Sequence, residues 1–86
     1  MPSYEETNAA IAAACDIARQ ALGPLQQAHD QLDQARGALL SVVEESARAD
    51  AEQAITHWSR AMEEAVTAMQ GVSLGVQTAE SHAAGT

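Results

Sequence analysis

Apolar residues recur along this chain in alternating steps of four and three, which is the spacing of a heptad seam on an α-helix. The first series is Ile11, Cys15, Ala18, Leu22, Leu25, His29, Leu32, Arg36, Leu39 and Val43, in which His29 and Arg36 are polar. The second series is Ala51, Ile55, Trp58, Met62, Ala65, Met69, Val72, Val76 and Ala79. The second series is out of phase with the first. The pattern therefore predicts two helical arms, at about 4–45 and 50–80, with a frayed tail at 81–86.

Gly23-Pro24 is the strongest helix breaker in the chain. Proline removes a backbone donor and clashes with the preceding turn, which costs about 3 kcal/mol in a helix interior. Gly23 is suited to the end of one helix and Pro24 to the first position of the next. The seam nevertheless continues in phase from Leu22 to Leu25. We therefore expect the first arm to be kinked at 23–24 and roughly collinear, with no reversal there.

The junction between the arms carries signals that disagree. Ser46 and Asp50 are good N-cap residues, and they favour a short turn at about 45–50. Arg48, in contrast, is spaced to form i,i+4 ion pairs with Glu44 and Glu52, which would support one unbroken helix. We favour the turn, so that the arms form an antiparallel hairpin, and keep the single rod as the alternative.

The length of 86 residues is enough for a single domain, 1–86, but a chain this short has a marginal core of its own. Small proteins usually gain stability from disulfides, a metal or a partner chain. Cys15 is the only cysteine, so no internal disulfide can form, and it is expected to be a buried small apolar side chain. Alanine-rich helices also bury little area per residue. Association with another chain is therefore the expected source of stability.

The charge balance excludes several kinds of partner. Twelve acidic residues against four arginines give a formal charge of -8, which is opposite to the basic patches that bind nucleic acid or anionic membranes. No apolar run approaches the roughly 20 residues needed to span a bilayer. The N-terminal residues lack the basic start and apolar stretch of a signal peptide. We expect a soluble protein, located in the cytoplasm unless it is exported without a cleaved signal.

The second seam suggests a contact site. Trp58 is the only tryptophan, and it shares its stripe with the adaptable side chains of Met62 and Met69. These residues are candidates for a partner interface, although packing in the core of the hairpin is the favoured interpretation for each of them. Further apolar residues lie beside the seams, where a two-helix hairpin cannot cover them: Ile17, Leu40, Val42 and Val66. Those side chains predict a second layer of helices.

Polar residues in the first seam have two interpretations. His29 and Arg36 at a positions can set register or oligomeric state. Alternatively, the drift of a straight helix moves them to the edge, and Ala28 and Ala35 take the inner places. His29, Asp30 and Asp33 lack the Glu-x-x-His spacing of helical di-metal sites, so we expect neither a metal nor a cofactor. No phosphate-binding loop or catalytic set occurs, and we expect no enzyme activity.

The chain is small, its arms are alanine-rich, and the stretch from Leu32 to Leu40 leads through Glu45-Ser46 to Asp50. In these features it resembles the WXG100 or ESX-like class of actinobacterial helical hairpins. This resemblance implies pairing in four-helix bundles and export without a cleaved signal. The class places Trp-x-Gly in its turn, whereas Trp58 here is followed by Ser59-Arg60 within the second arm. The class also tends to carry a C-terminal Tyr-x-x-x-Asp/Glu signal, and the tail of this chain has no tyrosine.

Together these features predict an all-α protein–protein interaction module that pairs with itself or with a related helical chain in a four-helix bundle, most simply as a homodimer. The alternatives are an ESX-like secreted effector or export partner and, after that, a metal-binding bundle. The predicted interface residues are Leu22, Leu25, Leu32, Leu39, Val43, Ile55, Trp58, Met62 and Met69.

Overall fold

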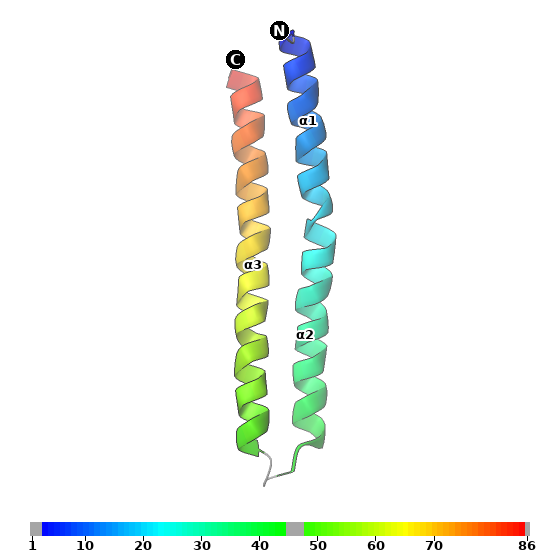
Figure 1. Ribbon diagram of the computed structural model, residues 1–86, viewed down its shortest axis with the longest axis vertical. Helices are drawn as coiled ribbons and strands as arrows, with labels where there is room; N and C mark the ends of the chain where they lie inside the picture. Colours follow the sequence, from blue (N-terminus) through cyan, green and yellow to red (C-terminus); the bar gives the residue numbers. More distant parts are fainter. Residues whose placement is uncertain (1–2, 45–47, 86) are drawn as a thin grey trace.

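The protein is a long two-armed helical hairpin (Figure 1). The computed structural model describes residues 3–44 and 48–85. Helices α1 (Tyr4–Gln20) and α2 (Leu22–Val42) form the first arm, and α3 (Arg48–Gly85) forms the second. The arms lie side by side and antiparallel, so both chain ends are at the same end of a body measuring 66 × 17 × 15 Å. The prediction of an all-α antiparallel hairpin is confirmed, and the single unbroken rod is wrong.

Helix α1 begins with a capping box. The Ser3 hydroxyl accepts a hydrogen bond from the Glu6 backbone N–H at 3.1 Å, and the Glu6 carboxylate accepts one from the Ser3 backbone N–H at 3.2 Å. These bonds satisfy two backbone donors that a helix start leaves without partners, and such a cap stabilises a helix by about 1 kcal/mol. The cap explains why the helix starts at Tyr4.

The break in the first arm lies at Ala21, two residues before the predicted kink at Gly23-Pro24. A proline ring clashes with the carbonyl four residues earlier, which for Pro24 belongs to Gln20, so α1 ends at Gln20. Pro24 itself lies in the first turn of α2, where a missing N–H costs little. The Ala21 N–H bridges the break by donating to the Ala18 carbonyl at 3.1 Å. Figure 1 shows that α1 and α2 stay roughly collinear, as expected.

Gly23 does not end a helix as predicted. Among the described residues no glycine has a positive φ, so Gly23 does not adopt the left-handed conformation of a helix C-terminal glycine. The residue at the break, Ala21, keeps a right-handed helical backbone at φ -71° and ψ -21°. The Leu25 N–H then donates to the Ala21 carbonyl at 3.2 Å and opens the hydrogen-bond ladder of α2.

The chain reverses earlier than predicted. Helix α2 ends at Val42 instead of 45, and Val43 is extended at φ -78° and ψ 132°. Helix α3 starts at Arg48 instead of 50, so Asp50 lies in its first turn and is not the N-cap. Ser46 lies outside the described residues. Of the two ion pairs weighed for a single rod, Arg48–Glu52 forms inside α3 at 3.7 Å, whereas Glu44 precedes that helix.

The predicted frayed tail is helical. Helix α3 runs through Gly71 and Gly75 and continues to Gly85, well past residue 80. Its last turns lie beside the start of α1, where the Tyr4 hydroxyl donates to the Ala83 carbonyl at 3.4 Å. The tail therefore has the first arm as a neighbour, which explains why it continues the helix.

Both heptad series lie on the facing sides of the arms. The buried residues of the described chain are Cys15, Ala51, Met62 and Val76, and the other positions of both series are half-buried. Cys15, at 3% exposure, is the buried small side chain that its position predicted. His29 is half-buried while Ala28 is exposed, so the drift interpretation is wrong there. Arg36 and Ala35 are both half-buried.

Candidate protein interface

The predicted interface residues all line the seam within one hairpin. Met62 is buried, and the rest are half-buried: Leu22, Leu25, Leu32, Leu39, Val43, Ile55, Trp58 and Met69. The two arms alone therefore leave part of most of these side chains accessible to water. Trp58 in particular sits in the seam of α3, about three turns after the start of that helix.

The hairpin buries few residues and exposes several large apolar ones. No described side chain is completely buried. Ile17 is 68% exposed, Val42 76% and Leu74 62%, and Leu40, Val66 and Tyr4 are also exposed. The four residues predicted to lie beside the seams, Ile17, Leu40, Val42 and Val66, are thus uncovered by the hairpin. Leu74 was missed because it lies on neither seam, and only its size marks it in the sequence.

The two broad faces of the hairpin differ in chemistry. With the seams at heptad positions a and d, the e and b positions of both arms flank one face, and the g and c positions flank the other. The first, which we call the polar face, carries Glu5, Asp16, Arg19, Asp30, Asp33, Glu52, Glu63 and Glu80. The second, which we call the alanine face, has at its g positions Thr7, Ala14, Ala21, Ala28, Ala35 and Val42 of the first arm and Ala54, Ala61, Ala68, Gly75 and His82 of α3.

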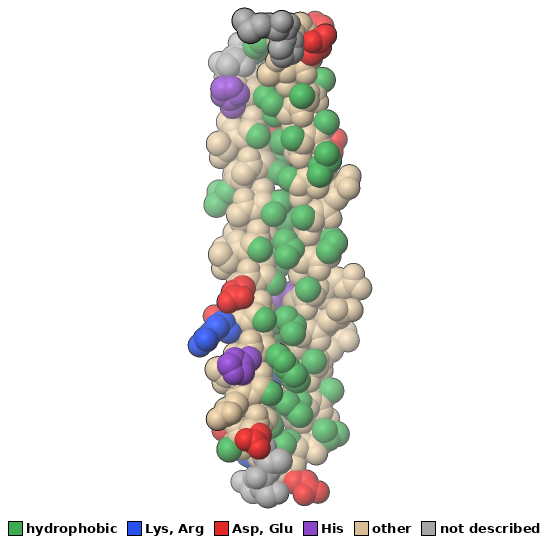
Figure 2. Space-filling view, viewed as in Figure 1, with side chains coloured by type: hydrophobic (Ala, Val, Ile, Leu, Met, Phe, Trp, Pro, Cys, Tyr) green, Lys and Arg blue, Asp and Glu red, His purple; other side chains and the backbone are tan. Residues whose placement is uncertain are grey.

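Charged side chains are rare on the alanine face. Its c positions are Ala10, Ile17, Pro24, Gln31 and Ala38 on the first arm and Asp50, His57, Glu64, Gly71 and Thr78 on α3. Because both arms are right-handed helices, this face points toward the viewer in Figures 1 and 2. Figure 2 shows hydrophobic side chains running from one end to the other over the middle of this face and over the first arm, whereas acidic and histidine side chains also lie on the α3 side. The first-arm half of this face is therefore free of Asp, Glu and Arg, and the α3 half carries Asp50 and Glu64.

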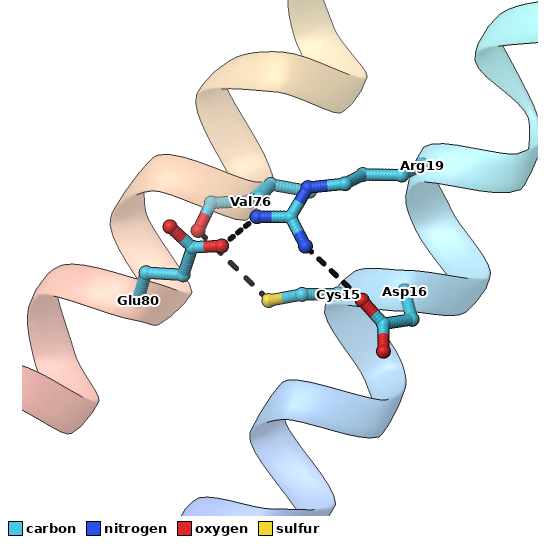
Figure 3. Close-up of polar contacts among 5 residues, drawn as sticks. All are labelled: Cys15, Asp16, Arg19, Val76 and Glu80. Carbon is cyan, nitrogen blue, oxygen red and sulfur yellow. Dashed lines mark hydrogen bonds and ion pairs between the residues drawn. The ribbon is translucent and has the colours of Figure 1, made fainter.

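Two arginines connect the arms on the other side. Arg19 forms ion pairs with Asp16, at 3.2 Å, and with Glu80 of α3 (Figure 3). Arg36 donates to the Asp33 carboxylate at 2.6 Å and to the Ser59 hydroxyl of α3 at 3.3 Å. The Arg19–Glu80 and Arg36–Ser59 contacts cross between the arms and so help to set their register. The Arg19 and Glu80 side chains are about half exposed, so water and salt weaken their attraction.

Beside the ion pair, Cys15 packs against α3. Its thiol donates to the Val76 carbonyl at 3.9 Å, a long and weak contact (Figure 3). The close approach of a thiol to a backbone carbonyl shows how near the two helices come at this small residue. The burial of Cys15 leaves its thiol little access to a reagent or metal.

His29 contacts an acidic neighbour on the first arm. Its ring Nδ1 lies 3.2 Å from the Asp30 carboxylate, which also accepts a bond from the Gln26 side-chain amide at 2.9 Å. These two hydrogen bonds lower the pKa of Asp30 below its ordinary value, and the bond from His29 has the larger effect.

Within residues 3–44 and 48–85, no three His, Cys, Asp or Glu side chains come together as a metal site would require.

The polar side of α3 also carries an apolar depression. It is shallow, has a volume of about 450 Å³, and is lined by Val66, Met69, Gln70, Ser73 and Leu74. All five residues belong to α3, so the depression does not extend across the hairpin. It offers room for one or two side chains of a partner and no enclosed site for a cofactor.

No protein family, curated protein or solved structure matches this chain in sequence or fold comparisons. Among the helices that the structure describes, none contains a segment long and apolar enough to cross a membrane.

Proposed function

We propose that this protein is a non-catalytic interaction module whose hairpin pairs with a second helical hairpin, its own copy or a related chain, in a four-helix bundle. One observation carries the proposal: only four of the described residues are buried in the hairpin, and Ile17, Val42 and Leu74 are more than half exposed. Free apolar surface of this kind marks interaction sites in soluble proteins.

The energetics support pairing. Each Å² of apolar surface removed from water contributes about 25 cal/mol, so a second hairpin laid along the first would add substantially to a small core. The hairpin offers a face of 66 × 17 Å, which is larger than the roughly 800 Å² that each partner contributes to a standard interface. A chain this small generally needs such support.

The seam residues have a part in this proposal. Leu22, Leu25, Leu32, Leu39 and Val43 of the first arm and Ile55, Trp58 and Met69 of α3 keep some exposure in the hairpin, and Met62 lies buried between them. In a four-helix bundle the core lies between all four helices, so residues on the seam of each hairpin also contact the other. Trp58 is the largest of them and is proposed as the anchor of the contact.

The molar mass in solution tests the proposal. Size-exclusion chromatography with light scattering should give about twice the chain mass of 9.0 kDa at micromolar concentration. A stable monomer under those conditions, with full helical circular dichroism, would contradict it. If a different helical chain co-purifies at a 1:1 ratio, the partner is the related chain and the module function stands.

A second candidate is an export partner of the ESX-like type. The antiparallel hairpin with a short connection between its arms supports it, because the resemblance implies this architecture. The position of Trp58 inside α3, far from the connection, departs from that class. Genes for the membrane ATPase of such a system beside the gene for this chain would support the candidate, and their absence would count against it. No observation favours the metal-binding alternative.

A further inference from the structure

We infer that the second hairpin is another copy of this chain and that the two copies pack through their alanine faces, with both polar faces left in water. This inference rests on the proposed function and adds the identity of the partner and the face it covers.

The distribution of charge selects the face. At the g and c positions that flank the alanine face, the first arm carries no Asp, Glu or Arg, and α3 carries only Asp50 and Glu64. The polar face carries seven carboxylates and Arg19, and Arg19 is already paired with Asp16 and Glu80. Two copies of a chain with a net charge of -8 that met through polar faces would bring carboxylates together. Contact through the alanine faces keeps those carboxylates apart and hydrated.

The shape of the face suits a second copy. Alanine or glycine occupies the g positions from Ala14 to Ala35 and from Ala54 to Gly75, and small side chains there allow helices to approach closely. Ile17, at a c position in the last turn of α1, and Val42, at a g position at the end of α2, project from the first arm at 68% and 76% exposure. A two-fold interface uses the same patch on both copies, so that patch must be compatible with itself. The first-arm half of the surface, which is long, uncharged and mostly of small residues with two apolar projections, meets this requirement. The α3 half adds Asp50, His57, Glu64 and His82, all of them exposed.

The seam already extends toward this face. Ala35, Ala54 and Ala61, which flank the seam at g positions, are half-buried. Of the residues at the e positions of the polar face, only Ser59 is half-buried in the described chain. Apolar surface therefore continues without interruption from the seam into the alanine face, and a bundle core centred there would include both.

The depression lined by Val66, Met69 and Leu74 is the competing surface. It lies on α3 alone, and neighbouring Glu63 shares its side of the helix. A hairpin laid over it would also cover Glu52 and Glu80 at the same flank. Glu52 and Glu80 are paired with Arg48 and Arg19, and these ion pairs are exposed to water. Taking such pairs out of water costs hydration that their attraction does not fully restore, so this surface is the less favourable one for a second acidic chain.

Matched charge substitutions test the inference. Ala68→Glu and Ala28→Glu each place one negative charge on the alanine face. Their controls add the same charge elsewhere: Gln70→Glu, two residues after Ala68, on the polar face, and Gln27→Glu, one residue before Ala28, on the outer side of the first arm. All four positions are exposed in the hairpin, so each arm keeps its own packing. Sedimentation equilibrium should show that the first pair weakens self-association at least roughly tenfold and the second pair by much less.

Circular dichroism of each variant checks that its helices are intact, and Ala68→Gln separates the effect of size from that of charge. If Gln70→Glu dissociates the dimer and Ala68→Glu does not, the alanine face is the wrong face while the proposed function stands. If the protein pairs only with a different chain, the inference that the partner is a second copy of this chain is wrong. If the unsubstituted chain is a monomer that binds no helical chain, the proposed function itself fails.

Discussion

The guanidinium of Arg19 in α1 forms an ion pair with the carboxylate of Glu80 in α3, 61 residues further along the chain (Figure 3). The pair joins the last turn of α1 to α3, in the half of the hairpin that lies away from the reversal between α2 and α3. Both side chains are about half exposed, which limits their contribution to stability. Its main role in the hairpin is therefore to set the register of the arms, and apolar packing supplies most of the stability.

A double-mutant cycle on this pair should give a small coupling energy. Arg19→Met and Glu80→Gln each remove the attraction while keeping much of the side-chain stem. We expect the coupling in the free energy of unfolding to be about 0.2–1 kcal/mol and to fall as salt is raised. Urea unfolding of the four proteins, at one fixed concentration, measures it. A coupling above about 2 kcal/mol would show that the pair is far better shielded from water than its exposure indicates.

Met62 should be among the most sensitive positions. It is 8% exposed and lies in the seam of α3, so Met62→Ala removes buried apolar atoms and leaves a gap. We expect a loss of about 2 kcal/mol or more in the free energy of unfolding. Thr67→Ala, at an exposed position of the same helix, is the control and should change stability by less than about 0.5 kcal/mol. Equal losses in the two variants would mean that the seam is not the core.

Gly37→Ala should stabilise the protein. Gly37 lies within α2, and a methyl group built there meets nothing within 4 Å. Alanine is favoured over glycine in a helix by about 0.5–1 kcal/mol because the unfolded glycine has more conformational freedom to lose. Thermal unfolding at fixed concentration should show a higher midpoint. The reverse change at the next residue, Ala38→Gly, should lower the midpoint, and a destabilising Gly37→Ala would reveal a contact that the hairpin lacks.

The contact between His29 and Asp30 predicts a pH effect. Hydrogen bonds from His29 and then Gln26 hold the pKa of Asp30 below its ordinary value, so the ionised carboxylate favours the folded state. A group with a lowered pKa in the folded protein contributes stability above its unfolded pKa, and that stability is lost as pH falls through the folded pKa. The effect should therefore be present at neutral pH and fade below about pH 4. It should be small because Asp30 is exposed.

NMR titration of the Asp30 carboxyl carbon measures this pKa directly. His29→Ala should raise it toward the ordinary value, and Gln26→Ala should raise it by less, since His29 is the larger cause. Gln27→Ala leaves both hydrogen bonds in place and serves as the control. An unchanged titration in His29→Ala would show that the ring does not contact the carboxylate in solution.

Local periodicity was enough to predict much of the fold. A helix repeats every 3.6 residues, so the spacing from Ile11 to Val43 and from Ala51 to Ala79 identified which side of each arm faces the other. The same pattern placed Ile17, Leu40, Val42 and Val66 beside the seams, where they are exposed. These features depend on residues within a few turns of one another, and for that reason they can be read along the chain.

Element boundaries were predicted less well, for reasons that differ along the chain. The break at Ala21 follows from the clash between Pro24 and the carbonyl of Gln20, so the helix ends one turn before the proline that causes it. At the reversal the sequence offers N-cap residues and ion pairs of similar strength that favour different outcomes, so the pattern alone did not set the end of α2 at Val42 or the start of α3 at Arg48. A cap and an ion pair differ in free energy by too little for the spacing of residues to indicate which of them prevails.

The sequence by itself determined the all-α class, the two arms and the seam that joins them, because these follow from helical periodicity and the burial of apolar side chains. Only the tertiary structure decided the register that brings Arg19 to Glu80 and Arg36 to Ser59, and the extension of α3 to Gly85 beside Tyr4. It also decided that His29, and not Ala28, turns inward. Each of these depends on contacts between residues at least 23 positions apart or on the exact rotation of a packed helix, and neither property is local to the chain.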